Sequence, residues 1–224
     1  MNVTVAIPFR GGQVDREVAF DYTREYLRKL LPTARHIVVD TDHKPYNRSA
    51  GRNEAVRQAK SGIVIVCDAD SMPEKEPIEE AIEAASDGVL HIPYTVFTGL
   101  SREQTMRVLL QDAPFNGGKP QMISTSSVGG CMVIDCDAYW AAGGQDEGFV
   151  HWGGEDVAFW AACEALLGPT VRHSGILYGL WHPSEMNRKA PHYRQMIERQ
   201  NRYRALRRKP EAMRKLVFGD QKAG

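Results

Sequence analysis

Residues 63–70 read Ile63-Val64-Ile65-Val66-Cys67-Asp68-Ala69-Asp70, a short apolar run that ends in two carboxylates. Such a run, rich in β-branched side chains, is typical of a strand buried on both faces of a parallel sheet. Ligands of these sheets bind just beyond the carboxyl ends of the strands. Asp68 and Asp70 are two residues apart, so on an extended chain their side chains project to the same side. The pair predicts a divalent cation site completed by phosphate oxygens; the alternative is a polar turn after a buried strand.

The segments before this strand alternate between strand and helix patterns. Val3–Pro8 and residues 36–40 are predicted strands. Helical periodicity lies between them, with Asp15 as the expected N-cap, and a second helix over about residues 50–60 is expected to be capped by Ser49. The resulting order, strand-helix-strand-helix-strand, is that of a parallel sheet with right-handed crossovers.

The chain after residue 70 continues this mixture of strands and helices. Ser101 and Gln104 have the spacing of a capping box, which predicts a helix that extends to about Gln111. Residues 113–127, rich in Gly, Pro, Asn and Ser, are predicted to be a mobile loop. Strands are expected near residues 89–93, 131–134, 170–172 and 175–180, and helices over about residues 73–86, 137–142, 155–167 and from Pro191 onward. We therefore predict an α/β protein, a single domain with a mixed, mostly parallel central sheet flanked by helices.

Length and composition are those of an ordinary globular protein. Of the 224 residues, 42% are hydrophobic and 25% are charged, so one well-buried core can form without a second domain. The sequence contains no apolar run of about 20 residues, the length of a membrane span, and its first residues lack the layout of a secretory signal. The four cysteines form no C-x-x-C pair and lie in apolar segments, which predicts buried, reduced thiols and a cytoplasmic protein.

The net charge of zero conceals an asymmetry between the body and the C-terminal tail. Residues 1–186 carry 16 Lys/Arg and 25 Asp/Glu, whereas residues 187–224 carry 12 and 3. Two interpretations remain open: the basic tail folds back on the acidic body, or it contacts a polyanion, for which residues 187–215 supply the charge.

Charged and aromatic side chains at the predicted strand ends suit a nucleotide. Arg10 and Asp40 follow the first two strands and, in a parallel sheet, lie at the same edge as the central aspartate pair. Asp40 could accept hydrogen bonds from a ribose or base, Phe9 offers an apolar surface, and Arg10 offers a fork of donors for a phosphate. Arg52, in the first turns of its helix, is a second phosphate candidate. A solvated arginine and a loop acid are the alternatives for Arg10 and Asp40.

A further polar group, His151-Trp152-Gly153-Gly154-Glu155-Asp156, precedes a predicted helix. Its two glycines let the backbone approach a ligand closely, and its two acids lie where the helix dipole favours negative charge. Because that field should keep Asp156 ionised at neutral pH, its carboxylate suits a base that accepts a proton from a hydroxyl group. The same field also accounts for acids at a helix N-terminus that have no catalytic role.

One histidine stands at the end of a late predicted strand. His182 follows that strand and precedes a proline. A neutral imidazole at this place could complete a metal site begun by Asp68 and Asp70. His173 is the rival ligand, and a purely structural histidine is the remaining alternative.

In their order along the chain, these motifs resemble those of nucleotide-sugar glycosyltransferases of the GT-A fold. They are most similar to the β-1,4-galactosyltransferase and polypeptide N-acetylgalactosaminyltransferase groups. The matching segments run from residue 5 to residue 183 and comprise Ile7-Pro8-Phe9-Arg10, Tyr46-Asn47-Arg48-Ser49, Asp68-Ala69-Asp70, Gly129-Gly130, Gly143-Gly144, Asp146-Glu147, residues 152–156 and Leu180-Trp181-His182. Each match is short, but their shared order over most of the chain makes the resemblance specific.

The resemblance implies a metal-dependent enzyme that moves a hexosyl or N-acetylhexosaminyl group from a UDP-sugar to a hydroxyl acceptor. It implies Mn²⁺ or Mg²⁺ held by Asp68, Asp70 and His182, with Asp156 as the base and Glu155 beside the sugar. The donor is expected to contact Pro8, Phe9, Arg10, Asp40, Arg48, Arg52, Asp68, Ala69, Asp70, Trp152, Gly153 and Gly154.

The same comparison suggests how the chain is divided. Residues 1–186 would form the GT-A domain, with residues 1–112 as its nucleotide-binding half and residues 113–186 as its acceptor and catalytic half. Residues 187–224 would form a basic helical tail. The acceptor, whether glycan, protein, lipid or modified nucleic acid, is not selected by any sequence motif.

Two departures from the family pattern bear on mechanism. Val157 stands where the galactosyltransferases usually carry a third acid, whereas Asp156 matches their catalytic aspartate and implies inversion at the anomeric carbon. The N-acetylgalactosaminyltransferases retain configuration and have an asparagine there. The alternatives are a retaining enzyme of the same fold, a nucleotidyltransferase, and a module that binds polyanions or nucleic acid through the C-terminal helix. Gly11-Gly12-Gln13-Val14 lacks the lysine that a nucleotidyltransferase loop usually carries.

Overall fold

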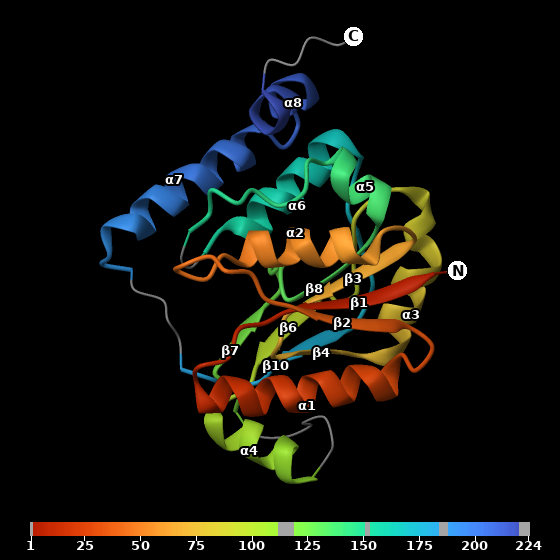
Figure 1. Ribbon diagram of the computed structural model, residues 1–224, viewed down its shortest axis with the longest axis vertical. Coiled ribbons are helices and arrows are strands. Elements are labelled where there is room, and N and C mark those ends of the chain that lie inside the picture. The colour runs from red at the N-terminus through yellow and green to blue at the C-terminus, as the bar shows by residue number, and fades with distance from the viewer. Residues whose placement is uncertain (1, 112–118, 151–152, 184–187, 220–224) are drawn as a thin grey trace.

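The computed structural model describes residues 2–111, 119–150, 153–183 and 188–219 and has an α/β architecture built on two sheets (Figure 1). Three strands, β1 (Val3–Pro8), β2 (Arg35–Val39) and β3 (Ile63–Cys67), run parallel. Every residue of β3 is buried, as expected of a strand covered on both faces. The parallel first half predicted from the sequence is confirmed.

The larger sheet has six strands in the order β2-β1-β3-β8-β5-β9. β8 (Cys131–Asp135) runs antiparallel to β3, and it also pairs antiparallel with β5 (His91–Ile92). β9 (Val171–Arg172) closes the other edge, parallel to β5. The sheet is therefore mixed, as predicted.

Helices cover the strands on both sides. In Figure 1, α1 (Val14–Leu30) lies on one side of the strands and α2 (Arg48–Ala59) on the other. The remaining helices that pack around this sheet are α3 (Lys75–Ala84), with the 3₁₀ turn η1 (Ala85–Asp87), α5 (Cys136–Ala141) and α6 (Glu155–Leu166).

Both predicted helix caps in the first half are wrong. Gln13 is the N-cap of α1, and Asp15 lies in the first turn. Asn47 is the N-cap of α2, where its side-chain oxygen accepts a hydrogen bond from Ala50 N at 3.0 Å. Ser49 is inside the helix, and its buried hydroxyl has no hydrogen-bond partner among the described residues. Asn47 takes the capping role because its backbone is extended while its short side chain reaches back to the first turn.

A second sheet, not predicted as such, has the order β4-β10-β6-β7. Its strands are β4 (Ser71–Pro73), β6 (Val96–Gly99), β7 (Met122–Ser124) and β10 (Ile176–Gly179). β7 lies within the segment predicted to be a mobile loop, of which residues 113–118 are outside the described residues. The helix α4 (Arg102–Gln111) begins with the predicted capping box: Ser101 N donates to Gln104 Oε1 at 2.9 Å, and Gln104 N donates to Ser101 Oγ at 3.2 Å.

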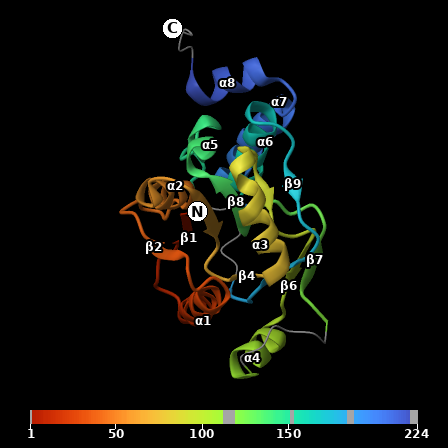
Figure 2. The ribbon, with the colours of Figure 1, turned by 90° about the vertical axis from the view of Figure 1, so that its right-hand side faces the viewer.

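The C-terminal helices α7 (Pro191–Leu206) and α8 (Pro210–Phe218) pack against α6, at the opposite end of the molecule from α4 (Figure 2). Met196, Tyr203 and Met213 of these helices are buried in one apolar cluster with Phe149 of the body. Arg199 forms a bidentate ion pair with Asp146, with N···O distances of 2.6 and 2.7 Å. This part of the basic tail therefore folds back on the acidic body.

Two further expectations concern the cysteines and the membrane. All four cysteines are buried free thiols, as predicted. Across the described ranges, no helix combines the length and apolar character needed to cross a bilayer.

Candidate active site

A cleft of about 530 Å³ opens at the carboxyl ends of β1 and β3. Side chains from both halves of the chain line it. From the first half these include Pro8, Phe9, Arg16, Tyr46, Arg48, Arg52, Asp68, Ala69, Asp70, Ser71 and Phe97. From the second half they include Met122, Ser124, Ser126, Ser127, Gly129, Gly130, Gly153, Gly154, Glu155, Asp156, Val157, His182, Tyr193, Ile197 and Gln200. The cleft lies where open α/β sheets bind their ligands.

Asp70 and His182 meet in this cleft. Asp70 follows β3, His182 follows β10, and the Nε2 atom of His182 lies 3.1 Å from Oδ2 of Asp70. The antiparallel pairing of β10 with β4 brings the two segments together, and Leu180 N donates to the Asp70 carbonyl at 2.8 Å. The predicted rival, His173, lies elsewhere, with its ring nitrogens 3.0 Å from His91 and 3.1 Å from Glu80.

Each member of the Asp70–His182 pair shifts the pKa of the other. Burial raises the pKa of Asp70, but the hydrogen bond and positive charge of His182 outweigh it and bring the pKa below its usual value. The hydrogen bond to Asp70 raises the pKa of His182, against the opposing effect of burial. A carboxylate oxygen and an imidazole nitrogen therefore converge at a place that favours positive charge.

These two side chains fit a divalent cation that takes its other ligands from elsewhere. Within residues 2–111, 119–150, 153–183 and 188–219, no three His, Cys, Asp or Glu side chains are grouped closely enough to hold a metal ion by themselves. Asp68 is engaged instead by Arg52, whose NH2 atom donates to Asp68 Oδ1 at 2.6 Å. Two protein ligands, with oxygens of a phosphate and water, are the usual environment of a cation that binds together with a nucleotide.

Arg52 lies between the two halves of the site. It is only 2% exposed, and besides Asp68 it contacts Gln145 at 3.0 Å and Glu155 at 3.6 Å. Burial lowers the pKa of Arg52, but Asp68 and Glu155 raise it by a larger amount, so the guanidinium stays charged. Its donors are directed at these protein groups, and its Nε atom has no partner in the described part of the chain.

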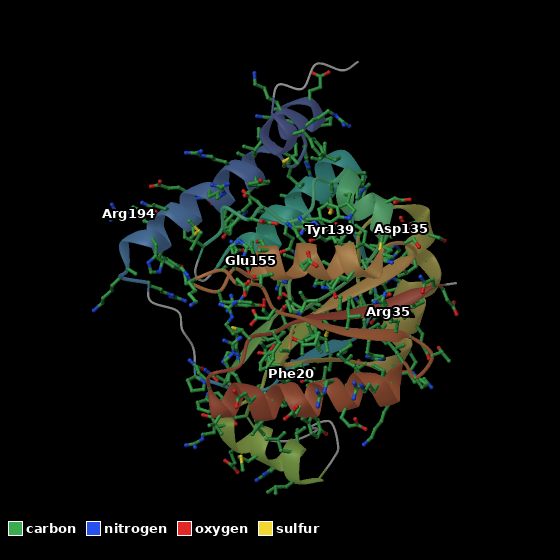
Figure 3. The ribbon with its side chains drawn as sticks, viewed as in Figure 1. Phe20, Arg35, Asp135, Tyr139, Glu155 and Arg194 are labelled. Atoms are coloured by element: carbon green, nitrogen blue, oxygen red, sulfur yellow. The ribbon has the colours of Figure 1, made fainter. Side chains whose placement is uncertain are left out.

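The N-terminus of α6 brings two acids to the cleft. Glu155 is 6% exposed and lies 3.6 Å from both Arg48 and Arg52, where the N-termini of α6 and α2 approach each other (Figure 3). Asp156 lies beside it and lines the cleft. Burial, followed by the negative charge of Glu155, raises the pKa of Asp156 to about 6, with Arg52 opposing the shift.

A carboxyl group with a pKa of about 6 is still mostly ionised at neutral pH, as expected for Asp156. Its pKa nevertheless lies above the usual value of an aspartate, because desolvation and a neighbouring carboxylate raise it. A base with a pKa near the working pH is mostly ionised and still accepts a proton readily.

Of the other residues expected to contact the nucleotide sugar, some line the cleft and others lie outside it. Phe9 lines the cleft and stacks on Phe20, with ring centroids 3.9 Å apart. Arg10 and Asp40 are not among the lining residues; they bind each other, with Arg10 Nε 2.9 Å from Asp40 Oδ1. Contact of these two residues with a nucleotide stays a prediction. His151 and Trp152 lie outside the described residues.

One wall of the cleft corresponds to no motif in the sequence. Tyr193, Ile197 and Gln200 line it from α7. Their spacing places them on one helical face. Tyr203, also on α7, is 7% exposed, and its hydroxyl donates to Asp146 at 2.9 Å.

Comparison with known proteins bears on the family and the fold of this chain. The model of the family described as "Glycosyl transferase family 2" matches residues 18–141, more than half of the chain. The chain belongs to glycosyl transferase family 2. This glycosyltransferase has the GT-A fold, as its sequence motifs predicted. A search among curated proteins finds no match.

Solved structures similar to this glycosyltransferase include two of a Drosophila β1,4-galactosyltransferase 7. The catalytic domain with xylobiose is 12% identical, with 88% of this chain and 79% of that one covered, and the TM-score is 0.56. A mutant in complex with manganese, UDP-Gal and xylobiose is 13% identical, with 87% and 79% covered and a TM-score of 0.57. GalNAc-T7 with UDP, GalNAc and Mn²⁺ is 11% identical, with 88% and 48% covered and a TM-score of 0.53. At these identities the likeness establishes the shared fold.

Proposed function

We propose that this glycosyltransferase transfers a hexosyl or N-acetylhexosaminyl group from a UDP-sugar to a hydroxyl acceptor with the help of Mn²⁺ or Mg²⁺. The observation that carries the proposal is the 3.1 Å contact between Asp70 and His182 in the same cleft as Asp156. Manganese and UDP or UDP-Gal are present in the similar structures of GalNAc-T7 and the Drosophila enzyme. Asp70 and His182 would hold the cation, which supplies charge neutralisation for the departing diphosphate.

Asp156 is the proposed general base. As the acceptor oxygen attacks the anomeric carbon, its proton passes to the Asp156 carboxylate, and the bond between the anomeric carbon and the diphosphate oxygen breaks with its electron pair leaving on UDP. Such a base accompanies direct displacement, so we propose inversion of configuration. Arg52 holds Asp68 and Glu155, at 2.6 and 3.6 Å, in the same cleft as Asp156.

The first test is a panel of UDP-galactose, UDP-N-acetylgalactosamine, UDP-glucose and UDP-N-acetylglucosamine. Each is incubated with the protein and Mn²⁺, and the release of UDP is measured. Because water takes the place of the acceptor in this hydrolysis, the assay identifies the donor before the acceptor is known. The variants His182→Ala and His173→Ala serve as a matched pair, because only His182 contacts Asp70. Loss of Mn²⁺-dependent UDP binding in both variants, or in neither, would contradict the proposed metal site.

A second candidate function is favoured by one observation on the tail. Arg194, labelled in Figure 3, and Arg202, Arg204 and Arg208 are exposed and form no ion pair with any residue that the structure describes. We propose that these arginines, on α7 and in the segment that follows it, contact a polyanion. Removing the whole tail would destroy the α7 wall of the cleft, so charge reversal of Arg202, Arg204 and Arg208 to Glu is the cleaner test. Retention on heparin that is unchanged by reversal, with its salt dependence measured, would exclude this contact.

A further inference from the structure

The carboxylate of Asp156 rests directly on the backbone of Gly129. Its Oδ1 accepts a hydrogen bond from Val157 N at 2.8 Å, the one hydrogen bond to this carboxylate in the described chain. Its other oxygen faces Gly129, where an added Cβ would overlap Oδ2 and lie 2.9 Å from Cγ. Oδ2 therefore packs against Gly129 so closely that no side chain would fit between them.

A buried tyrosine holds that peptide. Tyr94 is 0% exposed, and its hydroxyl is hydrogen-bonded to the Gly129 carbonyl and lies 3.2 Å from the hydroxyl of Ser127. A carbonyl oxygen can only accept, and the tyrosine has one proton, so Tyr94 donates to Gly129 and Ser127 donates to Tyr94.

Gly130, the next residue along the chain, is held by a different segment. The Gly130 carbonyl accepts a hydrogen bond from Asp68 N at 2.7 Å. Residues 127–130 are therefore fixed between the Tyr94 side chain and the segment that carries the two central aspartates.

We propose that Tyr94 is a positioning residue for Asp156: by holding the Gly129 carbonyl, it fixes the surface on which the catalytic carboxylate rests. This inference rests on the proposed role of Asp156 as the base. Tyr94 lies outside every motif found in the sequence, and among the described residues it forms no hydrogen bond with Asp156, so the packing contact between them runs through Gly129. The competing explanation is that its hydrogen bond merely satisfies a buried hydroxyl and contributes to stability.

Tyr26 provides the matched control, because its hydroxyl also donates to a backbone carbonyl, that of Pro73, at 2.7 Å. Tyr94→Phe and Tyr26→Phe each remove one such hydrogen bond. We expect both to lower the melting temperature, and only Tyr94→Phe to lower kcat, by about tenfold, with KM for the UDP-sugar nearly unchanged. Equal kcat and an equal pH profile in the two variants would overturn the proposal.

A second pair of variants tests the contact itself. Gly129→Ala places a methyl group against Asp156, whereas Gly175→Ala places one against Pro77, away from Asp156. We expect Gly129→Ala to lose activity nearly as completely as Asp156→Asn, and Gly175→Ala to keep its turnover per folded molecule. Normal turnover by folded Gly129→Ala would show that the Gly129 surface does not position the base.

A readout without turnover separates this inference from the proposed function. In ¹³C-carboxyl NMR, the titration of Asp156 should move in Tyr94→Phe and stay as in wild type in Tyr26→Phe. If Asp156→Asn retains wild-type activity, the base is wrong, and the NMR titration still decides whether Tyr94 positions the carboxylate. If Asp156→Asn is inactive while Tyr94→Phe matches wild type in both assays, only the positioning role is overturned.

Discussion

The Nε2 atom of His182 lies 3.1 Å from the Oδ2 atom of Asp70, although the two residues are 112 positions apart in the chain. The contact depends on β4 and β10, two short strands whose antiparallel pairing aligns Ser71 with Gly179. The proposed chemistry therefore depends on a sheet of three- and four-residue strands.

Asp156→Asn should fold, should still bind UDP in the presence of Mn²⁺, and should lose about 10²–10⁴-fold in turnover, the usual contribution of a general base. Asp15→Asn is the control, because Asp15 also lies in the first turn of a helix but not in the cleft. The measurement is UDP release together with UDP binding by calorimetry. Near-normal turnover by Asp156→Asn would remove this residue from the mechanism.

The activity should also depend on pH. Since burial and Glu155 raise the pKa of Asp156 to about 6, kcat/KM should fall as the pH is lowered through about 6, where the base becomes protonated. The residual activity of Asp156→Asn should lack this acid limb. A wild-type profile that stays flat between pH 5 and 7 would be the contrary result, with the two pH values chosen as about one unit either side of that pKa.

The same raised pKa predicts an effect on stability. Between its unfolded value near 4 and its folded value of about 6, Asp156 binds more protons in the folded state, so its contribution to the free energy of unfolding decreases as the pH rises. At pH 7, Asp156→Asn should therefore be more stable than wild type, by about 1–2 kcal/mol after allowance for partial exposure and for Glu155. The difference should shrink toward about pH 4. Denaturant unfolding at both pH values tests this, and a variant less stable at pH 7 contradicts it.

Arg52→Met should be strongly destabilising. The substitution leaves Asp68 and Glu155 without their buried partner, which typically costs about 3–5 kcal/mol. Arg57→Met, on the same helix and 52% exposed, should change stability by no more than about 0.5 kcal/mol. Urea denaturation measures both variants. Equal losses would mean that the Arg52 ion pairs contribute nothing beyond those of a surface arginine.

Local patterns in the sequence predicted much of the framework. The buried run of β3 and the alternation of strands and helices before it were enough to predict the parallel half of the sheet. The Ser101–Gln104 capping box is confirmed because both of its hydrogen bonds lie within four residues of chain. The strands β4, β6 and β7 were missed, since such short segments take their partners from distant parts of the chain.

The sequence indicated several residues of the cleft but not the side chains that they contact. Asp68 and Asp70 were expected to bind the metal together. Asp68 is bound by Arg52 while Asp70 faces His182, and a role of Asp68 as a metal ligand stays a prediction. Alternation along a strand indicates the side toward which a carboxylate points, but it does not indicate which side chain from elsewhere in the fold lies on that side. Arg10 and Asp40, both assigned to the nucleotide, bind each other.

By itself, the sequence determined the α/β framework, the acids at the strand ends and a helix that begins at Glu155, because each depends on residues that are neighbours in the chain. Three features depend on the tertiary structure: His182 rather than His173 faces Asp70, α7 forms a wall of the cleft, and burial raises the pKa of Asp156 to about 6. The first two features arise from pairing and packing between distant segments, and the raised pKa arises from desolvation and from charges brought together across the fold. All three are set by three-dimensional proximity, which a local pattern does not contain.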